Sequence, residues 1–256
     1  MPRVLFAVGS LFAVIVATMH AAPAWSMWRP ASCMPDRCFC EAVASGWIRQ
    51  PANTLSSLLF CLAGSLVLLT NPLDRGPRYS SDKYLFWASM MFIGLGSAFF
   101  HASLSFWGQT SDVLGMYLLA TLLLLWSARS STRLSPAQEI ATFVAGNVVL
   151  LSALVFVPAV RRYVFAALIL ALILLEIRRK RELSHRSMRV FGSALAIMTF
   201  GFVIWIADLT KVACAPSSWL QGHAIWHASG AAAATLMFVY FHPPRRVVDD
   251  VGAVRL

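Results

Sequence analysis

Seven apolar stretches constrain this chain more than any other feature of its sequence. Short charged or turn-forming links separate these stretches, which cover residues 51–70, 84–104, 111–128, 137–159, 163–177, 190–207 and 222–241. The core of a bilayer needs roughly 20 mostly apolar residues per helix, so each stretch can span a membrane with modest tilt. Only 12% of the 256 residues are charged, against roughly 25% in soluble domains. The sequence therefore predicts an all-α membrane protein, a bundle of seven transmembrane helices.

The basic residues indicate topology rather than nucleic-acid binding. The formal net charge is +10, but the basic residues lie in short loops and form no soluble basic face. Positively charged loops tend to remain cytoplasmic. An external N-terminus puts 14 Lys and Arg residues inside and leaves six outside, which are Arg29, Arg37, Arg49, Arg161, Arg162 and Lys211. We therefore expect the N-terminus outside and the C-terminus in the cytoplasm.

The N-terminal residues predict a cleavable signal peptide. Arg3 precedes an apolar stretch from Val4 to Met19, and small residues follow at 21–24; this order is typical of secretory signals. An additional, uncleaved helix is the alternative. The expected organisation is a signal peptide at 1–24, an extracytoplasmic segment at 25–50, a seven-helix domain at 51–241 and a cytoplasmic tail at 242–256.

Three histidines are expected to meet near the outer face of the membrane. An ionisable group inside a membrane helix is costly unless it is paired, so each one suggests a function. His101 ends the second stretch, while His223 and His227 open the seventh and lie on one helical face because they are four residues apart. Three histidines and a water form the usual catalytic zinc site. The sequence therefore predicts zinc bound by these three residues.

Two other interpretations of the histidines stay open at this point. Each could be a packed, hydrogen-bonded structural residue, or the set could hold haem, since bis-histidine haem sites also occur in helical bundles. Histidines four residues apart on one helix, however, chelate a small ion rather than face each other across a porphyrin.

Four further polar residues lie in or beside the apolar stretches. Ser97 is four residues before His101 and shares its helical face, so it could bind a substrate carbonyl or the developing oxyanion, or merely bond its own helix. Asp112 is expected to open the third helix, either as an N-terminal cap favoured by the helix dipole or as the general base. Glu139 and Glu176 are expected at helix ends, in the interface.

These motifs together resemble a known family. The set Ser97-x3-His101, Asp112 and His223-x3-His227, with Cys40-Glu41 and the segment Gln50-Pro51-Ala52-Asn53-Thr54-Leu55-Ser56, is similar to the alkaline ceramidases and their bacterial relatives over about residues 36 to 241. The histidine motifs are shared with a wider seven-helix superfamily that includes the progestin and adipoQ receptors, haemolysin-III-like proteins and Per1 lipid remodellers. The resemblance implies zinc on the histidines, Ser97 and Asp112 as catalytic residues, and ceramide as substrate.

The resemblance also implies a calcium site and a disulfide. The calcium candidates are Asp36, Glu41 and Asn53, but Gln50 stands where the family usually has a glutamate, and calcium prefers several charged oxygens. Asp36 is also displaced by one residue from the usual spacing, so we expect a weaker site.

The family pairs Cys40 with Cys214, and both are expected on the outer side, where a disulfide persists. Cys33 and Cys38 are expected there too, so that either could compete for Cys214 or the two could pair together. Cys61 is expected to be a small buried apolar residue.

The sequence thus predicts a zinc-dependent lipid amide hydrolase that cleaves a ceramide-like membrane lipid to a fatty acid and a sphingoid base. We expect it in a bacterial inner membrane with its site towards the periplasm, without nucleic acid or an obligatory protein partner. One alternative is a lipid esterase or phospholipid remodeller with the same zinc chemistry. Another is a non-catalytic receptor with structural zinc, which predicts a closed, four-ligand site.

Overall fold

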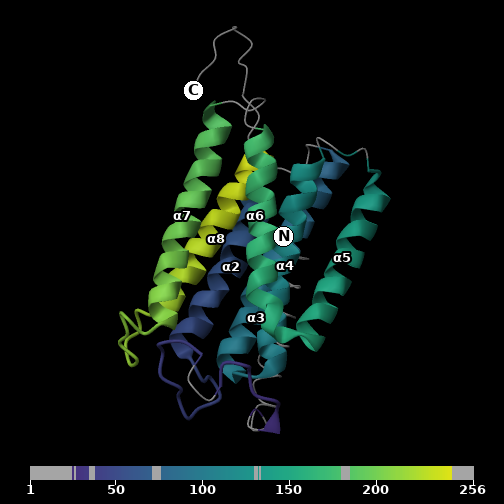
Figure 1. Cartoon of the computed structure of the whole chain (residues 1–256). Coiled ribbons are helices and arrows are strands. Elements are labelled where there is room, and N and C mark those ends of the chain that lie inside the picture. Colours follow the sequence, from purple (N-terminus) through teal and green to yellow (C-terminus); the bar gives the residue numbers. More distant parts are fainter. Residues whose placement is uncertain are drawn as a thin grey trace.

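The described part of the chain is a bundle of α-helices. The computed structural model describes residues 25, 27–34, 38–70, 76–129, 132, 134–179 and 185–243. Within these residues lie seven α-helices and the 3-10 turn η2 (Pro158–Val160), the helices being α2 (Pro51–Thr70), α3 (Pro77–Ser103), α4 (Phe106–Ala128), α5 (Pro136–Phe156), α6 (Arg161–Arg179), α7 (His185–Leu209) and α8 (Gly222–Phe241). The helices run side by side as one bundle (Figure 1). The predicted all-α class is confirmed.

Six of these helices are long and apolar enough to cross a bilayer, all but α6. Helix α6 begins with Arg161 and Arg162 and ends with Arg178 and Arg179, so its uncharged centre is short. The composition is that of an integral membrane protein, while the seventh span and the orientation stay predictions. The expected signal peptide lies outside the described residues.

The predicted helix bounds agree best with the structure where polar or turn-forming residues end the apolar stretch. Helices α2 and α8 have the predicted bounds, whereas α3 begins at Pro77 rather than near residue 84, and α4 begins at Phe106 rather than 111. The first turns of α3 are polar, so hydropathy does not indicate their helical structure. They are helical because Asp82 finds partners inside the bundle.

A buried ion cluster holds one end of the bundle, here called the opposite end. Asp82 of α3 accepts hydrogen bonds from Arg129 (2.7 Å) and from the indole of Trp126 (3.1 Å). Arg129 also pairs with Glu139 of α5 at 2.9 Å, and Glu176 accepts from Ser127 and Tyr240. Glu139 and Glu176 lie at helix ends, as expected, and both are buried against other helices. Paired partners, rather than water, satisfy these carboxylates.

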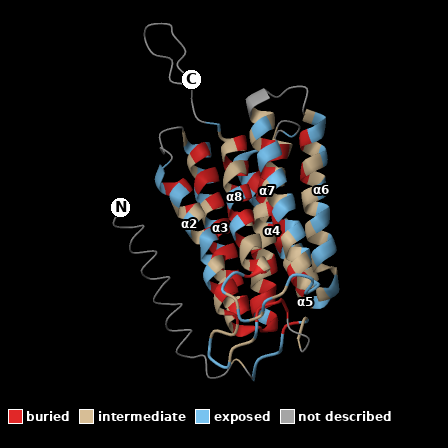
Figure 2. Ribbon diagram, turned by 90° about the vertical axis from the view of Figure 1, so that its left-hand side faces the viewer, coloured by how far each residue is buried: buried red, intermediate tan, exposed pale blue. Residues whose placement is uncertain are grey.

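The N-terminal segment covers the other end, here called the histidine end. Disulfides join Cys33 to Cys38 and Cys40 to Cys214, and the second one ties this segment to the loop between α7 and α8. Glu41 caps α2, because its carboxylate accepts from the backbone amides of Ala52 (2.7 Å) and Asn53 (2.9 Å). Figure 2 shows buried residues gathered in the interior of the bundle and beneath this segment.

Candidate metal centre and active site

The three predicted histidines meet in a buried cluster at the histidine end. His101 comes from the last turn of α3, and His223 and His227 come from the first two turns of α8. One ring nitrogen of each lies within 4.8 Å of the others, and the Nε2 atoms of His101 and His223 are 3.1 Å apart. All three are almost fully buried. The arrangement can hold one metal ion.

The hydrogen bonds of Gln50 assign the tautomer of His101. The amide nitrogen of Gln50 donates to the carbonyl oxygen of Glu41 at 3.3 Å, which leaves its Oε1 as the acceptor 2.8 Å from Nδ1 of His101. Nδ1 must therefore carry the proton, and Nε2 keeps a lone pair for a metal. Gln50 is fully buried, so water does not replace this contact.

Ser56 orients His227 in the same way. Its hydroxyl donates to the carbonyl oxygen of Asn53 at 3.1 Å and lies 2.8 Å from Nδ1 of His227. Ser56 can accept from Nδ1–H in one tautomer of His227, and that tautomer leaves Nε2 unprotonated. With that tautomer, two histidines present lone pairs to one point before any ion binds.

His223 is fixed by its backbone and by stacking. Its amide donates to Asp208 of α7 at 3.0 Å, and the second oxygen of Asp208 accepts from the amide of Cys40, also at 3.0 Å. A side chain at Gly222 would meet Cβ of Asp208 at 2.9 Å, so glycine permits this close approach. The Phe39 ring stacks on the His223 ring, with centroids 3.7 Å apart. Among the described residues, Nδ1 of His223 has no hydrogen-bond partner.

Ser97 lies directly beside the histidines. Its Oγ is 3.3 Å from Nε2 of His227 and 3.1 Å from the Ser57 hydroxyl oxygen. The alternative that Ser97 serves only its own helix is therefore not the arrangement seen.

Asp112 does not open its helix as expected. Helix α4 begins at Phe106, and its cap is Ser105, whose hydroxyl accepts from the amide of Gly108 at 3.1 Å. Asp112 lies in the second turn of α4, where it interacts with Ser97 of α3. A side chain at Gly96 would meet the carbonyl oxygen of Ser111 at 2.9 Å. The glycine therefore lets the two backbones approach closely enough to bring Ser97 and Asp112 together.

Only two of the three calcium candidates, Glu41 and Asn53, lie among the described residues. Asp36 lies outside the described residues, and the Glu41 carboxylate caps α2. Burial raises the pKa of Glu41 above its usual value, while the amides of Asn53 and Ala52 lower it. The side-chain amide of Asn53 is fully buried and has no partner among the described residues, so it could contribute to an ion site. Gln50 is directed at His101 instead.

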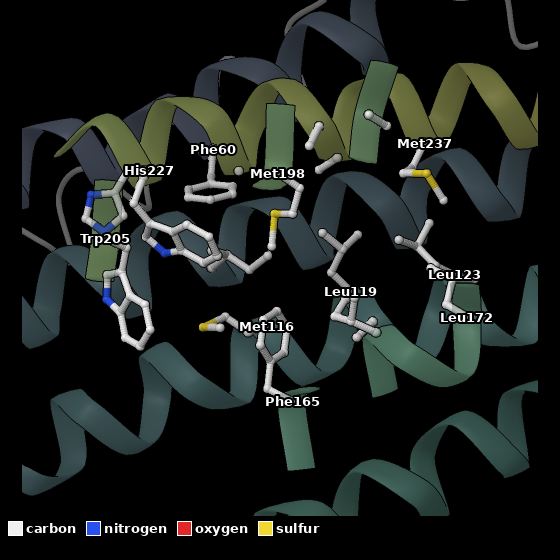
Figure 3. A pocket seen from close by; sticks show the side chains of 18 of the residues that line it. Phe60, Met116, Leu119, Leu123, Phe165, Leu172, Met198, Trp205, His227 and Met237 are labelled. Atoms are coloured by element: carbon white, nitrogen blue, oxygen red, sulfur yellow. The ribbon is translucent and has the colours of Figure 1, made fainter. Parts of the chain in front are cut away.

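Two apolar cavities with shared lining residues lie in the bundle, and the smaller one borders the histidine cluster. A cavity of about 170 Å³ is bounded by His223, His227, Ser97 and Asp112, and a larger one of about 630 Å³ shares Asp112 with it. Figure 3 shows the side chains that point into the first, among them Phe60, Met116, Leu119, Leu123, Phe165, Leu172, Met198, Trp205 and Met237. A largely apolar cavity that borders a polar cluster suits a lipid.

The larger cavity lies between helices that barely touch. Helix α6 packs against α4 and α7 packs against α8, whereas α6 and α7 make at most marginal contact with each other. Both helices contribute side chains to the larger cavity, including Phe165 and Ile169 from α6 and Met198 and Trp205 from α7. The two helices therefore face each other across this cavity.

Sequence reasoning missed the residues that support the histidines. Gln50 and Ser56 both lie in the segment that opens α2, where the sequence offers a family resemblance and no sign of contact with the histidines. Nothing in a single sequence places them beside residues 101 and 227. Asp208 and Phe39, which hold His223, were not predicted either.

Comparisons with known proteins agree with the site. The family model described as Ceramidase matches residues 35–249. The chain is 27% identical to alkaline ceramidase 1 of Homo sapiens over 212 residues, which cover 75% of each chain. It is 25% identical to the alkaline ceramidase of Drosophila melanogaster over 241 residues, 86% of this chain and 81% of that protein. With the motifs and the histidine cluster on the matched residues, this chain belongs to the alkaline ceramidase family.

Proposed function

We propose that this protein is a zinc-dependent intramembrane hydrolase of lipid amides, which cleaves a ceramide-like lipid to a fatty acid and a sphingoid base. One observation carries the proposal: three histidine nitrogens converge beside Ser97 and Asp112 at the inner end of an apolar cavity. A histidine metal site with no cavity and no other polar group beside it would suit a structural role. A metal cluster that opens onto a lipid-sized cavity and has an acid and a hydroxyl beside it suits a reaction.

The donor set fits zinc. Tetrahedral zinc with Zn–N bonds of 2.0–2.1 Å holds two nitrogens about 3.3 Å apart, close to the 3.1 Å between His101 and His223. Both Nδ1–H donors that orient the ligands have acceptors in Gln50 and Ser56, as is usual around histidine-bound metals. A zinc ion held there supplies Lewis acidity to the amide carbonyl and makes water a stronger nucleophile near neutral pH.

Asp112 and Ser97 have separate roles in this proposal. Asp112 takes a proton from the attacking water and returns it to the amine nitrogen when the C–N bond breaks. Ser97 donates to the carbonyl oxygen as negative charge develops on it. Their mutual contact holds both at the cavity end.

The apolar cavities bind the hydrocarbon chains and exclude water. Burying methylene groups stabilises the bound lipid by about 0.8 kcal/mol each. The substrate enters from the bilayer through the gap between α6 and α7, since both helices line the larger cavity. A lipid then reaches the metal without leaving an apolar environment.

The histidine end lies on the periplasmic side in this proposal, because most Lys and Arg residues lie in the links at the opposite end. A cytoplasmic reporter fused to the C-terminus is expected to be active, and a periplasmic reporter at the same position inactive. The reverse pattern of reporter activity would contradict the proposed orientation but not the proposed reaction.

The function is tested with the full chain purified in detergent. Metal content is measured first, and products of ceramides, N-acyl amino acids and phospholipids are then identified by mass spectrometry. We expect about one zinc per chain and release of a fatty acid from an amide. His223→Ala should lose both metal and activity. Full activity without stoichiometric metal would refute the zinc mechanism, and cleavage of esters alone would refute the substrate class.

A further inference from the structure

Two adjacent arginines line the larger cavity together with the proposed catalytic acid. Arg161 and Arg162 begin α6, and both bound the cavity of about 630 Å³ to which Asp112 also belongs. The Arg162 guanidinium carbon lies 5.7 Å from the ring centroid of Trp205 in α7, and Trp205 lines both cavities. The two cations therefore stand at the gap between α6 and α7.

The backbone of Arg161 is recessed within the bundle. The hydroxyl of Tyr117 donates to the carbonyl oxygen of Arg161 at 2.8 Å. Tyr117 follows Asp112 by five residues on α4, and a helix rises about 1.5 Å per residue. Tyr117 is thus about 7.5 Å farther from the histidine end than Asp112. The start of helix α6 therefore packs against the part of α4 that carries Asp112 and Tyr117.

The arginines lack an acidic partner in the described chain. A cation removed from water is costly unless it is paired. Arg161 is half-buried and Arg162 is exposed, and no described carboxylate, Asp112 included, forms an ion pair with either. Arg161 donates one hydrogen bond to the carbonyl oxygen of Pro158, at 2.9 Å. A guanidinium has five N–H donors, so most of this pair's capacity remains for a ligand. These charges also oppose the expected bias, because few basic residues lie at the histidine end.

We propose that Arg161 and Arg162 bind an anionic group on the substrate, a carboxylate or a phosphate near the amide, so that the enzyme prefers anionic N-acyl lipids to neutral ones. This inference rests on the proposed function and names its substrate class. Guanidinium groups suit the task because they make charge-assisted, often bidentate, hydrogen bonds to planar or tetrahedral anions. The apolar remainder of the cavity takes the acyl chain, and the arginine pair holds the charged end beside the reactive centre.

Phospholipid phosphates of the surrounding bilayer offer the same chemistry to an arginine pair. The two sources differ in how they respond to the medium. A contact with bulk lipid disappears in a non-ionic detergent and affects all substrates alike, whereas a substrate contact persists there and affects only anionic substrates.

The test compares matched pairs of amides in non-ionic detergent. N-palmitoylglycine and N-palmitoylethanolamine share an acyl chain and differ chiefly in charge, as do ceramide 1-phosphate and ceramide. We measure kcat/KM for wild type, Arg161→Gln, Arg162→Gln and the double variant. Lys211→Gln is the control, because Lys211 is a basic residue of the same end that does not line either cavity.

Wild type should prefer the anionic member of at least one pair by about 10-fold, the effect of one charge-assisted hydrogen bond. The arginine variants should lose that preference with little change on the neutral member, and the control should keep it. Equal rates on both members in wild type, or equal losses on both members in the variants, would overturn the inference and leave lipid amide hydrolysis standing.

A binding measurement separates this inference from the reaction itself. Hexadecyl phosphate and hexadecanol are compared as stabilisers of the melting temperature in the same detergent. Selective stabilisation by the phosphate, lost in the double variant, supports the anion site even if no amide is cleaved. Equal stabilisation by both compounds, or selectivity that survives in the double variant, contradicts it.

Discussion

Replacing Gln50 by alanine should weaken metal binding although Gln50 touches no metal. Its Oε1 accepts from Nδ1–H of His101 at 2.8 Å, and both residues are fully buried. Alanine leaves a buried N–H without an acceptor and frees the His101 ring to rotate or to move its proton to Nε2. Loss of such a partner typically lowers metal affinity 10- to 100-fold, which corresponds to about 1.4–2.7 kcal/mol.

The assay is a competition titration of the purified protein against a chelator of known affinity. Gln50→Glu is the matched variant, because a carboxylate still accepts from Nδ1 and only the donor to the Glu41 carbonyl is lost. We expect Gln50→Ala to fall by 10- to 100-fold in affinity and Gln50→Glu to stay near wild type. Wild-type affinity in Gln50→Ala would refute the argument that this hydrogen bond sets the tautomer. An equal loss in both variants would assign the effect to folding.

Three further predictions concern the chemistry, the covalent tie and the opposite end. Ser97→Ala should lower kcat by about 100-fold or more with metal content unchanged. The control is Ser152→Ala, which removes an exposed hydroxyl that bonds its own helix and should have no effect on kcat. Cys214→Ala breaks the disulfide between the N-terminal segment and the α7–α8 loop and should destabilise the fold by about 2–5 kcal/mol, seen as a lower melting temperature and earlier metal loss on heating. Asp82→Ala removes the bidentate partner of Arg129 and should cost about 3 kcal/mol, while the protein that remains folded keeps its metal.

The sequence predicted the helices and histidine positions that follow from hydropathy and residue spacing. The apolar stretches of α2 and α8 gave their bounds, because turn-forming or polar residues stop each one. The i, i+4 spacing put His223 and His227 on one face, since helix geometry needs no tertiary contact. His101 was expected at the same membrane depth as these two residues, and the three histidines do form one cluster.

Local patterns failed where a long-range partner changes the environment of a polar residue. The start of α3 and the burial of Glu139 and Glu176 depend on arginine, tyrosine and serine partners from other helices. Asp112 was expected at a helix start because a carboxylate there is favoured by the helix dipole, but Ser105 caps α4 instead. The absence of a side chain at Gly96 lets α3 and α4 approach closely enough to bring Asp112 near Ser97.

The sequence by itself determined that this chain is helical, apolar and equipped with three histidines at one depth, because periodicity and hydropathy are local properties. Only the tertiary structure decided how the histidine rings are oriented in the cluster, since that depends on Gln50 and Ser56, which lie far from the histidines in the chain. It also decided that the two arginines of α6 share a cavity with the reactive acid. Packing of α6 against α4 and of α7 against α8 creates that cavity, and packing between distant segments leaves no trace in a single sequence.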